Sequence, residues 1–171
     1  TEEAQEAIEE ARRRNPLGAA FAEAIEYEHN GDLDKAEKIY RKLLLRNPEN
    51  VEIFRRIGAL ATLKEQHIDA EIFLQRAVER APDFTHAWAD LVIAQMELEK
   101  YDDAVTSAEH LIRLDPNDAM SRLLLANARA MAGRHKDALD DYKKVIVKIP
   151  GNPGALSGMA HMLKTIGLQD E

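Results

Sequence analysis

The sequence contains no cysteine among its 171 residues. A disulfide framework, a cysteine-ligated zinc site and a thiol nucleophile are therefore excluded. It also lacks an apolar run near the ~20 residues that a membrane-spanning helix needs. Its first ten residues carry five glutamates, where a secretory signal would have basic and then apolar residues. These features predict a cytoplasmic protein with no membrane partner.

Positive charge is also scarce, because 23 Lys and Arg stand against 31 Asp and Glu, for a formal net charge of −8. Nucleic-acid binding relies on clustered Lys and Arg that displace counterions from phosphates, so we expect no nucleic-acid partner. Aromatic residues make up only 5%, but 45% of the residues are hydrophobic. That share is enough for a continuous core, which excludes disorder as the main state.

What the sequence does have is a repeat. Pro48, Pro82, Pro116 and Pro150 are each 34 residues apart. Since proline is not accommodated in a helix interior, these four positions mark recurring helix boundaries. Small residues, large apolar residues and turn residues recur at the same interval: Ala36, Ala70, Ala104 and Ala138; Ala24, Gly58, Val92, Ala126 and Ala160; Ile57, Leu91, Leu125 and Met159; Gly31, Glu65, Glu99, Gly133 and Gly167. The small positions indicate close helix contacts, and the last series indicates a residue that ends a helix in a left-handed turn.

Each unit predicts two amphipathic helices, A and then B, from apolar spacings of three and four. With Trp88, Leu91, Val92, Ala104 and Pro116 in the third unit, the pattern resembles the tetratricopeptide repeat. The resemblance implies an all-α, right-handed superhelical solenoid of antiparallel helix pairs. The pentatricopeptide repeat, which binds RNA, has a longer period and basic surfaces, and both features disfavour it.

The repeat phase also predicts where the units lie. We expect helix B of a preceding repeat over 1–16, full repeats over 17–50, 51–84, 85–118 and 119–152, and helix A of a further repeat over 153–171. Within the last unit the helix is expected to stop at Gly167. Pro16 departs from the pattern, because it precedes Pro48 by only 32 residues. Both ends fall at the same point of the repeat, so we expect a fragment of a longer array whose open ends offer a surface for self-association.

No catalytic constellation is visible in the sequence. There is no nucleophile with its base and no phosphate-binding glycine loop, and no two of the six histidines are three or four residues apart. We therefore expect no enzyme activity, no cofactor, no metal and no catalytic residue in this chain. The resemblance implies instead a non-catalytic scaffold that binds a peptide or a partner protein.

In tetratricopeptide repeats the ligand usually lies in a concave groove lined by the A helices. The equivalent positions here are Arg55, Thr62, His86, Ile93, Met96, Met120, Leu123, Leu124, Asn127, Met131, His161 and Lys164. Five of these form an apolar patch, namely Ile93, Met96, Met120, Leu123 and Leu124, where a surface helix is ordinarily polar. Two explanations stay open: the patch docks an extended or helical peptide, or flanking repeats or another copy of the chain cover it.

Two narrower resemblances bear on the partner. The carboxylate clamp of chaperone cofactors needs Lys, Asn and Arg in the groove, and those places hold Phe21, Ile25, Arg56, Met120 and Leu124, so the clamp is absent. The run Gly158–Glu171, with Arg80–Phe84, is similar to repeats that precede the catalytic domain of bacterial sulfotransferases. The alternative function is therefore the repeat arm of a larger enzyme, which recruits substrate or supports assembly.

Overall fold

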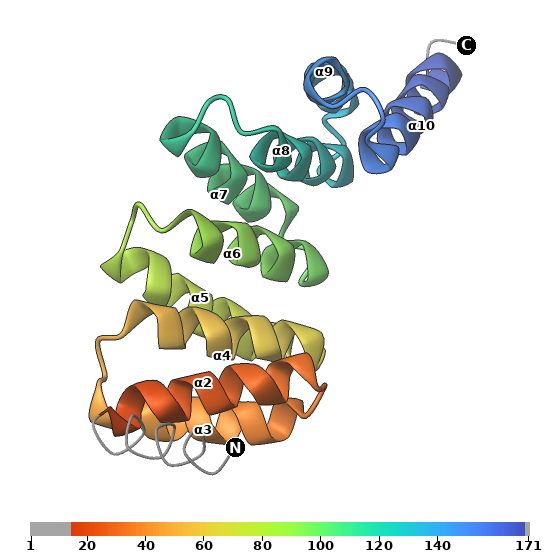
Figure 1. The fold of residues 1–171 in the computed structure, drawn as a ribbon. Coiled ribbons are helices and arrows are strands. Elements are labelled where there is room, and N and C mark those ends of the chain that lie inside the picture. Colours follow the sequence, from red (N-terminus) through yellow and green to blue (C-terminus); the bar gives the residue numbers. More distant parts are fainter. Residues whose placement is uncertain (1–14, 170–171) are drawn as a thin grey trace.

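The computed structural model describes residues 15–169, and their side chains to residue 167, as a stack of α-helices with no strand in that range (Figure 1). The helices are α2 (Pro16–His29), α3 (Leu33–Arg46), α4 (Val51–Leu63), α5 (His67–Arg80), α6 (Thr85–Glu97), α7 (Tyr101–Leu114), α8 (Ala119–Met131), α9 (His135–Lys148) and α10 (Pro153–Gln169). The predicted all-α solenoid is confirmed. The helix expected over 1–16 lies outside the described residues, except for its last two positions.

Asparagine or aspartate begins most of the A helices. The side chains of these capping residues accept hydrogen bonds from backbone N–H groups in the first turn: Asn15 from Gly18, Asn50 from Ile53, Asp118 from Ser121 and Asn152 from Ala155. Such caps satisfy donors that have no partner within the helix. Pro16 occupies the first position of α2, where its missing N–H costs nothing. The irregular spacing of Pro16 therefore has a structural reason: it begins a helix, whereas the periodic prolines lie beyond helix ends.

Helix A turns into helix B through one left-handed residue. Gly31, Glu65, Glu99 and Gly133 have φ angles of +79°, +59°, +58° and +75°. The next N–H then donates to a carbonyl five residues back, as in the bond of 2.8 Å from Gln66 to Ala61. The fifth residue of the series differs, because α10 continues through Gly167 to Gln169. A single glycine weakens a helix by only about 1 kcal/mol, which does not force it to end.

Glycine at the two glutamate turns is expected to stabilise the chain. A left-handed conformation costs a residue with a side chain about 1–2 kcal/mol. Glycine avoids this cost, but part of the benefit is lost because glycine makes the unfolded chain more flexible. We expect Glu65→Gly and Glu99→Gly each to raise the free energy of unfolding by about 0.5 kcal/mol in urea titrations. Gly133→Ala is the opposite control: its added Cβ meets nothing within 4 Å. Gly133→Ala should therefore lower the free energy of unfolding by about 1 kcal/mol, solely because alanine is strained at a positive φ. An unchanged stability of Gly133→Ala would contradict this explanation.

The core runs between the A and B helices along the whole stack. Ala36, Ala70, Ala104 and Ala138 are fully buried, as are Ala24, Val92 and Ala126. These alanines allow the helix backbones to approach closely, as their recurrence predicts. Ala160 is the exception, because it is exposed on α10. In the other repeats this position faces the helix B of its own pair, and no such helix follows α10 among the described residues.

Candidate functional site

The A helices form the inner face of the stack. Helix α4 packs against α6, α6 against α8, and α8 against α10, in addition to the contacts between neighbours in the chain. The backbones of the B helices α3, α5, α7 and α9 do not approach one another this closely within the described residues. From α4 to α10 the A-helix backbones thus lie closer together than the B-helix backbones, so the stack curves toward the A side. The predicted groove positions therefore belong to the elements on the inner side of the curve (Figure 1).

The first half of the inner face is lined by ion pairs. Glu28 of α2 bonds Arg56 of α4 at 2.7 Å, and Arg56 also bonds Glu52 at 2.7 Å. Glu52 in turn bonds Arg55 at 2.8 Å, and Arg55 reaches Asp90 of α6 at 2.9 Å. The alternating charges link three successive A helices. Of these five residues, Arg55 belongs to the predicted groove set and Arg56 stands at a groove place compared with the carboxylate clamp, whereas the three carboxylates were not predicted.

The pKa values of this row reflect its partial burial. The hydrogen bond to Glu52 raises the pKa of Arg55, while burial opposes the rise. Burial also disfavours ionisation of Glu52, but hydrogen bonds from Arg55 and Arg56 outweigh it and lower its pKa. Burial raises the pKa of Asp90, and the bond from Arg55 offsets only part of that rise. Glu52 is thus the best-stabilised carboxylate in the row, since both arginines of α4 bond it.

The second half of the inner face is apolar. Ile93 of α6 and Met120 and Met131 of α8 expose 37%, 54% and 57% of their surface. The other apolar groove positions are half-buried and pack against the core: Met96, Leu123 and Leu124. The predicted patch of five therefore divides into two side chains that face solvent, Ile93 and Met120, and three that support the helices. Met131, a groove position outside that patch, adds a third exposed apolar side chain.

The remaining predicted positions are more polar. The Thr62 hydroxyl donates to the Gly58 carbonyl at 3.2 Å, and the Asn127 amide oxygen accepts from the Tyr142 hydroxyl at 2.8 Å. Both side chains are therefore engaged within the fold. His86, His161 and Lys164 are exposed.

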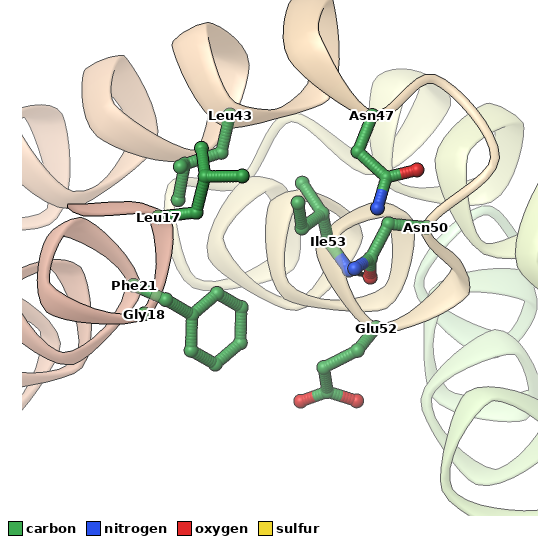
Figure 2. A pocket seen from close by; sticks show the side chains of 8 residues that line it. All are labelled: Leu17, Gly18, Phe21, Leu43, Asn47, Asn50, Glu52 and Ile53. Carbon is green, nitrogen blue, oxygen red and sulfur yellow. Dashed lines mark hydrogen bonds between the residues drawn. The ribbon is translucent and has the colours of Figure 1, made fainter. Parts of the chain in front are cut away.

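A pocket that the repeat pattern did not predict lies at one end of α2, α3 and α4 (Figure 2). Its volume is about 300 Å³, and it is lined by Leu17, Gly18, Phe21, Leu43, Asn47, Asn50, Glu52 and Ile53. Apolar side chains from α2 and α3 line one side, and the two asparagines lie toward the other (Figure 2). Glu52 connects this pocket to the ion-pair row. The amphipathic start of α2 was the available signal, but a pocket between helix ends depends on inter-repeat angles that the sequence does not specify.

No group of three His, Asp or Glu side chains within residues 15–167 is placed to hold a metal ion. No helix in that part is long and apolar enough to cross a bilayer. The site that the described residues do form is an extended surface, charged over α2, α4 and α6 and apolar over α6 and α8.

Stacked helix pairs with this inner face define a helical-repeat protein of the solenoid class. Residues 21–83 and 89–153 match the family model described as Tetratricopeptide repeat. Since these stretches cover more than half of the sequence, the chain belongs to the tetratricopeptide repeat family.

The chain is similar to one curated protein and two solved structures, among others. The chain is 28% identical over 156 residues to Cellulose synthase operon protein C of Pseudomonas fluorescens (strain SBW25), which covers 83% of this chain and 12% of that protein. A crystal structure of MamA superposes with a TM-score of 0.81 at 23% identity, covering 90% of this chain and 84% of MamA. The crystal structure of YrrB, described as "a TPR protein with an unusual peptide-binding site", superposes with a TM-score of 0.78 at 19% identity. The match covers 94% of this chain and 84% of YrrB. The two structures show the common fold, and none of the three names is that of a sulfotransferase.

Proposed function

We propose that this chain binds a peptide or a segment of a partner protein on its inner face. The observation that carries the proposal is the exposure of Ile93, Met120 and Met131 on adjacent A helices. Exposed apolar side chains that gather on one face are typical of docking surfaces. Methionine suits such a surface, because its flexible thioether adapts to different partners.

The ion-pair row complements the apolar half. Arg55 and Arg56 already have carboxylate partners on the inner face. A ligand gains little by displacing these internal pairs, since it must first break bonds that neutralise both arginines. The binding energy is therefore expected to come from α6 and α8, with the charged half setting the polarity of the neighbouring ligand residues. Family membership and the printed description of YrrB as peptide-binding support this assignment.

The test is a peptide selection. Short random peptides displayed on phage are selected on the wild-type chain, and the enriched peptides are measured in solution by fluorescence anisotropy. We expect apolar residues to be enriched and the double variant Met120→Glu, Met131→Glu to weaken binding by about 30-fold, which corresponds to about 2 kcal/mol. Both side chains are more than half exposed, so the variant should keep its helicity and melting temperature.

Two exposed apolar residues of the B helices provide a matched control. Ile68 of α5 is 67% exposed and Val147 of α9 is 81% exposed. The variant Ile68→Glu, Val147→Glu adds the same charge on the outer face and should bind the selected peptides as the wild type does. Equal binding by the inner-face variant, or no enrichment on the folded wild type, would remove the inner face as the docking surface.

A further inference from the structure

A second groove lies on the outer side of the stack, between the B helices α3 and α5. Its volume is about 600 Å³. Arg41 of α3 and Arg76 and Arg80 of α5 line it, together with Leu45 and one carboxylate, Glu49. This surface, the α3–α5 groove, shares no residue with the inner-face row or the apolar patch.

The charge of the α3–α5 groove is opposite to that of the protein. The groove is lined by three guanidinium groups and one carboxylate, and a second carboxylate, Glu37, pairs with Arg41, in a chain whose formal net charge is −8. Lys42 and Arg46 are also exposed on α3, so the positive surface extends beyond the groove along the same helix. A local field of this sign attracts anionic groups, even though the chain as a whole repels them.

The arginines are held in place and still have donors to offer. The guanidinium carbon of Arg41 lies 5.3 Å from the centre of the Phe73 ring, and that of Arg80 lies 5.0 Å from the centre of Phe54. Arg41 bonds Glu37 and Arg80 bonds Glu49, in each case through Nε. A guanidinium has five N–H donors, so most of them stay available on both side chains. Arg76 makes no ion pair with any described residue, which leaves its whole donor set for a ligand.

The equivalent groove one repeat later does not share these properties. Adding 34 to each position places Glu79 and Asp83 where Leu45 and Glu49 lie. Trp88 and His110 replace Phe54 and Arg76; their rings stack at 4.2 Å, and both side chains bond the Pro82 carbonyl. That groove is acidic at its rim and filled by its own aromatic side chains. The arginine lining of the α3–α5 groove is thus a local feature and not a consequence of the repeat.

Leu45 adds an apolar element to this basic site. It exposes 85% of its surface on the outer face of α3, where a repeat protein ordinarily presents a polar residue. We propose that the α3–α5 groove binds an acidic segment of a partner protein, whose Asp and Glu side chains pair with Arg41, Arg76 and Arg80 while an apolar side chain covers Leu45. Guanidinium groups pair with carboxylates in a bidentate fashion, which gives this recognition its specificity. The site is independent of the inner face, so the chain can hold two partners at once.

The test uses a labelled peptide of aspartate and glutamate residues with two leucines, and fluorescence anisotropy on the full chain. We expect saturable binding that weakens as salt is raised and that falls about tenfold in Arg41→Glu, Arg76→Glu, since each lost charged bond is worth about a factor of three or more. The charge-matched control, Arg113→Glu with Lys136→Glu, changes exposed residues of α7 and α9 and should bind as the wild type does. Helicity and melting temperature establish that both variants are folded.

Three results would overturn the proposal. The first is equal binding by the groove variant and the control variant. The second is equal affinity for a peptide in which lysine replaces every aspartate and glutamate. The third is binding of the acidic peptide only after Glu2, Glu3, Glu6, Glu9 and Glu10 are changed to Gln, because the occupant would then be the acidic start of this chain. A separate failure of the inner-face selection would leave these outcomes unchanged, since the two surfaces share no residue.

Discussion

Asp141→Ala is expected to lower the free energy of unfolding by about 3 kcal/mol, because it removes the buried carboxylate that joins α8 to α9. The Asp141 side chain is 1% exposed and accepts hydrogen bonds from Arg122 at 3.1 Å and from Arg129 at 2.6 Å. Arg129 also bonds Glu109 of α7 at 2.9 Å. One carboxylate and one arginine therefore connect three helices that are consecutive in the chain.

The size of the effect follows from what the variant leaves behind. Arg122 and Arg129 expose 17% and 22% of their side chains, so neither is fully hydrated once Asp141 is gone. Removing one partner of a buried pair typically costs about 3–5 kcal/mol. Partial access of water to both arginines places the expected loss at the lower end of that range. Asp141→Asn retains one acceptor and should lose less.

Asp140 offers a matched control at the neighbouring position. Its side chain is 67% exposed and meets Lys143 only at 3.5 Å, so Asp140→Ala should change stability by less than about 0.5 kcal/mol. Urea unfolding followed by circular dichroism gives both values. Hydrogen exchange should show faster exchange in α8 and α9 of Asp141→Ala, with α4 and α5 unaffected, because repeats interact chiefly with their neighbours. Equal stability of the two variants would contradict the role of Asp141.

The sequence predicted the helix pairs well because similar residues recur at the same positions of each repeat. A proline that recurs every 34 residues indicates one boundary, and Ala36, Ala70 and Ala104 indicate one packing position. The prediction was wrong at Gly167, where the helix continues. A left-handed turn depends on the helix that follows it as much as on the glycine.

The candidate site was less predictable than the fold. Hydrophobicity at groove positions pointed to Met120 and Ile93, which the structure places in solvent. It did not separate Met120 from Leu123, which lies three residues later on the same face of α8, because the packing of neighbouring helices decides which of the two is covered. The ion-pair row was missed, although Glu52 stands three and four residues before Arg55 and Arg56, a spacing that favours such pairs. Its links to Glu28 and Asp90 depend on how neighbouring repeats are rotated, which the sequence does not state.

Within each helix pair, residue sizes compensate across the interface. In three repeats the small residue of helix A and the residue sixteen positions later on helix B belong to one core region: Ala24 with Tyr40, Val92 with Ala108, and Ala126 with Tyr142. The pair in the second repeat is Gly58 with Leu74. A Cβ added to Gly58 would lie 2.5 Å from Cγ of Leu74 and 3.2 Å from the Ala70 carbonyl oxygen. In the second repeat, the side chain on helix B thus limits the size of the residue that helix A can hold at this position.

This compensation predicts that the effect of Gly58→Ala on the free energy of unfolding changes sign with the size of the residue at position 74. In the wild type, Leu74 is fully buried, and the added methyl should cost about 1–2 kcal/mol through overpacking, despite the helix propensity of alanine. Leu74→Ala alone should cost about 3 kcal/mol, because it leaves a cavity. In the Leu74→Ala background, Gly58→Ala should instead stabilise by about 1 kcal/mol, since the methyl then enters vacated space and the helix gains propensity.

A double-mutant cycle in urea measures this coupling, which we expect to be about 2–3 kcal/mol. Leu63→Ala provides the control on the same pair of helices, because Leu63 is 68% exposed and its truncation leaves no cavity. Its effect should add to that of Gly58→Ala without coupling. If Gly58→Ala destabilised both backgrounds equally, the close approach of α4 and α5 would be set by the Ala70 carbonyl and not by Leu74. Sign reversal would instead show that the residue size tolerated at position 58 depends on the size of its partner on helix B, Leu74.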